Sequence, residues 1–96
     1  MKQTLTALTV AATMFASSAS AFDPDDLQKL KDSNECAECN LEGADLMGAN
    51  LDSADLRNAD LYGANLRNAN LNSATMKGAI LCNSIMPDGS VIYSGC

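Results

Sequence analysis

Cys36 and Cys39 form the one C-x-x-C pair in the chain and are the first candidates for chemistry. Such a pair can exchange thiol and disulfide when one sulfur is held as a thiolate, usually at the start of a helix. Glu35 and Glu38 flank the pair here, and their negative charges disfavour a thiolate. Asn40 follows the second cysteine where haem attachment would need a histidine. A disulfide staple is therefore the favoured interpretation, and a thiol–disulfide protein that uses this pair is the alternative.

The rest of the composition excludes several other classes of function. The chain has no histidine, and no activated serine or paired carboxylate set is recognisable, so it is predicted to be neither an enzyme nor a binder of metal or cofactor. The formal net charge is −6, with 12 acidic and 6 basic side chains. An acidic chain of this kind is not expected to bind nucleic acid or anionic lipid by electrostatic attraction.

The first 21 residues have the composition of a secretory signal peptide. Lys2 supplies the positive start, residues 5–16 are apolar apart from three threonines, and Ala19-Ser20-Ala21 is a small-residue cleavage site. The apolar run is too short to span a membrane. The sequence thus predicts an exported chain that begins at Phe22, in the periplasm or outside the cell, without a membrane anchor.

Ten consecutive five-residue steps, from residue 39 to residue 88, must position these groups. Each step has an apolar centre, a small residue two positions before it, and usually Asp or Asn directly before it. The predicted buried centres are Leu41, Leu46, Leu51, Leu56, Leu61, Leu66, Leu71, Met76 and Leu81. A period of five fits neither an α-helix nor a flat strand. The second residue after each centre, from Gly43 to Asn83, is Gly, Ser or Asn, which predicts a turn every five residues.

This A-(D/N)-L-x-x pattern resembles the pentapeptide-repeat family. The resemblance implies an all-β fold, a right-handed quadrilateral β-helix in which four five-residue sides make one coil and residues twenty apart stack. The repeats would make about two to three coils, a length that needs caps at both ends. Within the predicted β-helix, residues 36–88, none of Asp45, Asp55 and Asp60 stacks on another acid, so they are interpreted as a solvated face and not as a calcium site.

Export implies that the four cysteines form two disulfides. In the implied coil, one turn separates Cys36 from Cys39, with Cα atoms less than about 7 Å apart. Cys82 lies about two coils from Cys39, which is too far for a bridge. The favoured pairs are therefore Cys36–Cys39 and Cys82–Cys96.

The segments that flank the repeat predict two caps. Asp23 and Pro24 are typical of a helix start, and the helix is expected to run to about Lys31. After a turn at residues 87–90, the β-prone residues 91–93 are expected to cover the open edge of the last coil. The predicted organisation is a signal peptide (1–21), a capping helix and linker (22–35), a β-helix (36–88) and a capping tail (89–96).

The leading functional hypothesis is a non-catalytic, exported module that binds a protein partner or has a structural role. Met47, Arg57, Tyr62 and Arg67 are the candidate partner contacts, because Met, Arg and Tyr are favoured at interfaces. The partner is an unknown protein, and the chain is expected to be a monomer or an end-stacked dimer. Some members of the family mimic DNA and inhibit topoisomerases, but the short repeat, the scattered acids and the export signal argue against that function here.

Overall fold

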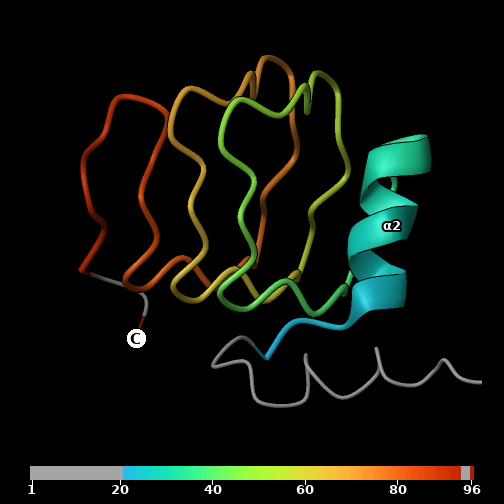
Figure 1. The fold of residues 1–96 in the computed structure, drawn as a ribbon, viewed down its shortest axis with the longest axis horizontal. Helices are drawn as coiled ribbons and strands as arrows, with labels where there is room; N and C mark the ends of the chain where they lie inside the picture. The colour runs from blue at the N-terminus through green and yellow to red at the C-terminus, as the bar shows by residue number, and fades with distance from the viewer. Residues whose placement is uncertain (1–20, 94–95) are drawn as a thin grey trace, which may run out of the picture.

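The protein is a stack of square coils preceded by one helix, α2 (Pro24–Ser33), which lies alongside the first coil (Figure 1). The computed structural model describes residues 21–93 and 96, so the predicted signal peptide lies outside the described residues apart from Ala21. Within those residues the coils contain no extended strands, only single parallel bridges between residues twenty apart. The bridged pairs are Glu35–Asp55, Asn40–Asp60, Asp45–Asn65, Asn50–Asn70, Asp55–Thr75, Asp60–Ile80 and Asn65–Ile85. The spacing of twenty is the register predicted from the repeat.

Backbone hydrogen bonds join each coil to the next at the centre of every side. The Leu46 amide donates to the Asn65 carbonyl at 2.8 Å, and the Asn65 amide donates to the Ala44 carbonyl at 2.9 Å. The same pair of bonds recurs on the next side, where the Leu51 amide donates to the Asn70 carbonyl and the Asn70 amide donates to the Ala49 carbonyl. A parallel ladder of this kind leaves the alternate residues free to point into or out of the coil.

A turn closes each five-residue side, as the repeat predicts. The Ala54 amide donates to the Leu51 carbonyl at 3.0 Å across one such turn, and Ser53 has a φ of 62°. Positive φ at the third turn residue is typical of type II turns and favours Gly and Asn. Glu38 takes the same conformation, with a φ of 65°, inside the turn that the Cys36–Cys39 disulfide closes.

The core consists of the repeat centres and the small residues two positions before them. The centres from Leu41 to Leu66 are buried, together with Ala44, Ala54, Ala59 and Ala64. The last three centres among those predicted to be buried, Leu71, Met76 and Leu81, are only partly buried. They belong to the last coil, and no further coil among the described residues stacks on them.

Helix α2 is fixed at both ends by its own sequence. The Asp23 carboxylate accepts a hydrogen bond from the Asp25 amide at 2.9 Å, which satisfies one of the open amides of the first turn. The helix continues to Ser33, two residues beyond the predicted end, because Asn34 adopts a left-handed conformation and its amide bonds to the Leu30 carbonyl. Leu30 is fully buried against the first coil, with Leu27 partly buried beside it.

The C-terminal tail folds back on only one side of the last coil. Ile85 forms an antiparallel bridge with Val91, and the Asn83 amide donates to the Ile92 carbonyl at 2.7 Å. A disulfide joins Cys96 to Cys82. In residues 21–93 and 96, no helix is long and apolar enough to cross a membrane.

Candidate functional site

The two cysteine pairs are bonded as disulfides in the combinations favoured from the sequence. Cys36 and Cys39, with Cα atoms 5.2 Å apart, are both buried in the core. Cys82 and Cys96 have Cα atoms 5.1 Å apart. None of the four cysteines is free. Because the thiolate is the reactive form of cysteine, a buried disulfide in this position offers no nucleophile for redox exchange.

A ladder of side-chain acceptors runs along the corners of the coils. In each case the Oδ1 atom accepts a hydrogen bond from the amide two residues later, at 3.0–3.2 Å. The acceptors are Asn40, Asp45, Asn50, Asp55, Asp60, Asn65 and Asn70. Asp and Asn are the residues that form such local turns. The sequence interpretation treated the aspartates here as a solvated face and missed this structural role.

The signal for the ladder was present in the sequence. From Asn40 to Asn70 the residue before each centre is always Asp or Asn, and either type forms the same turn. The pattern stops at Thr75, and Ile80 and Ile85 follow at the next two positions. The last coil is therefore different in chemistry from the coils before it.

One aspartate of this ladder, Asp55, also forms an ion pair with Arg57. Asp55 Oδ1 accepts a hydrogen bond from Arg57 Nε at 2.8 Å, and Asp55 Oδ2 lies 2.6 Å from Arg57 Nη2. The side-chain hydrogen bond from Arg57, followed by the Arg57 backbone amide, lowers the pKa of Asp55 to about 2. Bidentate pairs of this kind fix the arginine in one orientation, so Arg57 is not a free surface cation.

The pH dependence of stability should report this pair. A carboxyl whose pKa is lower in the folded chain stabilises the fold above its unfolded pKa of 3.8 and loses that effect as the pH falls toward 2. We expect Asp55→Asn, which keeps an Oδ1 acceptor, to be less stable than the parent chain at neutral pH and to approach its stability as the pH falls through 2. Urea unfolding at a series of pH values measures this difference. A difference that persists unchanged at the lowest pH would assign the effect to lost packing.

The four candidate partner contacts do not form one patch. Met47 and Arg67 lie on the same corner column, where the Gly48 amide donates to the Arg67 carbonyl, and Met47 is 54% exposed. The Tyr62 hydroxyl, on another corner, accepts a hydrogen bond from Asn83 at 2.9 Å. Arg57 is held by Asp55 as described above. Only the Met47 column thus offers an unengaged apolar side chain beside a cation.

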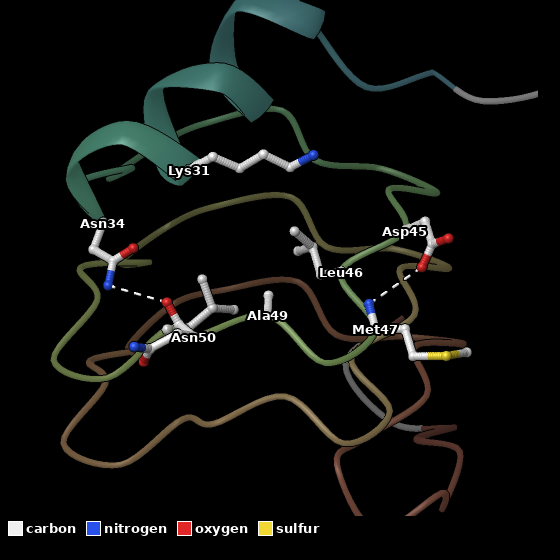
Figure 2. A pocket seen from close by; sticks show the side chains of 8 residues that line it. Lys31, Asn34, Asp45, Leu46, Met47, Ala49 and Asn50 are labelled. Atoms are coloured by element: carbon white, nitrogen blue, oxygen red, sulfur yellow. Dashed lines mark hydrogen bonds between the residues drawn. The ribbon is translucent and has the colours of Figure 1, made fainter.

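A shallow hollow of about 340 Å³ lies between the C-terminal half of α2 and the first coil (Figure 2). Sequence reasoning did not identify it. It is lined by Lys31, Asn34, Asp45, Leu46, Met47, Ala49, Asn50 and Leu51.

The hollow marks the part of the first coil that α2 does not cover. On the adjacent side, the Asn40 amide donates to Asp26 at 2.8 Å and the Asn40 carbonyl accepts from the Asp23 amide at 3.0 Å. The Asn34 side chain bonds to the Asn50 carbonyl at 3.3 Å (Figure 2). No described residue gives the Asp45 backbone amide or carbonyl a comparable partner.

In the described residues, the hollow offers polar and apolar side chains suited to binding. In the part of the chain that the structure describes, no three His, Cys, Asp or Glu side chains are grouped to hold a metal ion. The hollow brings one lysine and one aspartate together with apolar side chains, without a nucleophile and base in contact.

Comparison with known proteins agrees with this geometry. The family model of pentapeptide repeats matches residues 35–61 and 49–86, in eight copies, and so covers more than half of the chain. The chain belongs to the pentapeptide-repeat family. Pentapeptide-repeat proteins form a right-handed β-helix and are generally non-enzymatic, and the matches indicate no catalytic family.

Two solved pentapeptide-repeat structures are similar to the chain over part of their length. HetL, involved in heterocyst differentiation regulation in the cyanobacterium Nostoc sp. strain PCC 7120, is 41% identical over 60% of this chain and 22% of its own, with a TM-score of 0.43. Rfr23 from the cyanobacterium Cyanothece 51142 is 40% identical over 47% of this chain and 41% of its own, with a TM-score of 0.28. The chain thus spans less than half of either protein. No curated protein matches it significantly.

Proposed function

We propose that the chain is an exported, disulfide-stapled pentapeptide-repeat module that acts without catalysis, by binding a protein partner or by a structural role. Residues 1–21 are removed as a signal peptide, and the mature chain begins at Phe22. It works in the periplasm or outside the cell. Helix α2 caps the first coil, and the C-terminal tail covers one side of the last coil.

The pairing of all four cysteines is the observation that carries this proposal. Both pairs have Cα separations within the range of a disulfide, at 5.2 and 5.1 Å. Disulfides persist in oxidising compartments, and small exported domains use them because their cores are too small to be stable alone. A leader of the signal-peptide type precedes the same domain.

A binding role is supported by the rigidity of the coil and by the side chains on its outer corners. In the turns from residue 42 to residue 73, each corner side chain starts from a backbone that coil-to-coil hydrogen bonds and an Asp or Asn acceptor hold in place. Met47 and Arg67 share one corner column, and both residue types are favoured at protein interfaces. A preorganised surface loses little entropy on binding.

The two alternative functions, a thiol–disulfide protein and a DNA-mimicking topoisomerase inhibitor, lack support of this kind. A thiol–disulfide function would need an accessible thiolate, whereas Cys36 and Cys39 are buried and bonded to each other. A DNA mimic would need acids along the whole stack, and residues 61–87 contain none.

Intact mass of the protein from its native compartment tests the proposal. We expect a chain that starts at Phe22 and takes up no alkylating reagent until a reductant is added. The full-length chain expressed without export in a reducing cytoplasm is the control, and it should be alkylated directly. A native chain that retains residues 1–21, or that has free thiols at Cys36 and Cys39, would overturn the proposal of an exported, stapled module.

A further inference from the structure

The end of the stack away from α2 keeps an unpaired β-edge. At the positions that join coil to coil elsewhere, five amides there donate no hydrogen bond, and three carbonyls accept none, to any residue that the structure describes. The amides are those of Leu71, Ser73, Met76, Gly78 and Leu81, and the carbonyls are those of Ala69, Ala74 and Ala79. One coil earlier the equivalent groups are the ones that join coil to coil, as in the Leu51–Asn70 and Ser53–Asn72 bonds. This end thus has free backbone donors and acceptors that could pair with a further coil or strand.

The tail of the protein shows how this edge accepts a strand. Its bridge between Val91 and Ile85 is antiparallel, while every bridge between coils is parallel. The tail pairs only beside residues 83–86, so the sides centred on Leu71 and Met76 remain open. Because the edge turns every five residues, a straight strand could follow only one side. A chain with the same five-residue turns can follow more than one.

The same end differs from the rest of the protein in polarity and charge. Leu71 and Met76 are partly exposed there, and Ile80 and Val91 are exposed apolar side chains. Residues 61–87 carry no acid, whereas every acidic residue except Asp88 lies in residues 23–60. Two copies that met at this end would bring only Asp88 of each copy near the contact, in a chain whose net charge is −6.

The opposite end does not offer a comparable surface. Helix α2 lies against the first coil there (Figure 1) and adds the exposed acids Asp25 and Asp32. A second copy that approached that end would meet like charges before it met an unpaired edge.

We propose that the C-terminal end of the β-helix binds a second copy of this chain, coil edge to coil edge, about a two-fold axis perpendicular to the stack. A two-fold axis makes the facing edges antiparallel, which is the pairing that the tail already uses. The interface is isologous and therefore closes at two copies without forming a fibre. This inference rests on the proposed function in one respect: the chain that dimerises is the oxidised chain that begins at Phe22.

Charge placed on the last coil tests the interface without removing a core residue. Thr75→Asp with Ile80→Asp restores the ladder residue that Asp55 and Asp60 provide one coil earlier, so the fold should be retained. We expect the dissociation constant of the dimer to rise about tenfold or more, because four added carboxylates gather at one interface. Sedimentation velocity over a concentration series measures it. The matched control is Asn50→Asp with Asn65→Asp, which adds the same charge at the same repeat position away from the end.

Hydrogen exchange of single amides locates the interface. We expect the amides of Leu71, Ser73, Met76 and Gly78 to exchange more slowly as the chain concentration rises. The Asp45 amide, at the opposite end and also unpaired, should exchange rapidly at every concentration.

Three results would overturn the proposal: a monomer throughout the concentration series, a doubly charged variant that dimerises as tightly as the parent chain, or concentration-dependent protection at Asp45 instead. A monomer that is nevertheless exported and oxidised would leave the proposed function standing. A reduced or uncleaved chain that still dimerises through residues 71–78 would remove the proposed function and keep the interface.

Discussion

Leu61→Ala is expected to lower the free energy of unfolding by about 2–5 kcal/mol, the range for deletion of a buried leucine side chain. Leu61 is completely buried and stacks between Leu41 and Leu81 in the same column. The neighbouring backbone cannot collapse into the space that the substitution creates, because coil-to-coil hydrogen bonds hold it on both sides. The Leu61 amide bonds to the Ile80 carbonyl at 2.9 Å, and the Asp60 amide bonds to the Cys39 carbonyl at 2.9 Å. Since small domains are only marginally stable, much of the population should unfold.

Leu71→Ala is the matched control, since Leu71 occupies the same repeat position in the last coil and is only partly buried. We expect a clearly smaller loss of stability there, because less apolar surface returns to water and the open end can relax. Denaturant unfolding with both disulfides intact measures the two variants, at a concentration low enough for the chain to be monomeric. Equal losses at Leu61 and Leu71 would mean that the last coil is as well covered as the middle coil.

The repeat made the register of the fold predictable from sequence. A strict period of five with Gly, Ser or Asn at one position sets the turns, and the turns set the stacking of residues twenty apart, such as Asp45 on Asn65. The inward residues follow from the same count, because a narrow coil has room for one large and one small apolar side chain per side. Leu56 and Ala54 illustrate the pair, and both are fully buried.

Features that depend on the ends of the stack were not predictable in the same way. A repeat pattern is the same in every coil, so it does not show that Leu71 lies at an open end while Leu51 is buried. The hollow beside Lys31 depends on how much of the first coil α2 covers, and the sequence of the helix does not give its length or its angle of docking. Asn34 ends the helix two residues later than expected, because its left-handed conformation lets one more hydrogen bond form.

Leu30→Ala is expected to detach α2 from the first coil. Leu30 is the one residue of the helix that is buried, and it belongs to the same core cluster as the repeat centres. Ten residues are too few for a stable helix in water without tertiary packing. Alanine has the highest helix propensity, so a loss of helix in this variant would come from lost packing and not from local preference. We expect a loss of about 2–5 kcal/mol, together with faster exchange of the α2 amides.

Leu27→Ala makes the same change one turn away, at a side chain that is only partly buried. It should leave α2 docked, with a smaller loss of stability. Far-ultraviolet circular dichroism and hydrogen exchange of the α2 amides separate the two variants. If α2 stayed protected in Leu30→Ala, the polar contacts of Asp23 and Asp26 with Asn40 would be holding the helix. If it detached, the Asn40 amide and carbonyl would lose those partners, and the first coil would present an unpaired edge like the one at the opposite end. The burial of a single leucine would then decide whether the stack has one open end or two.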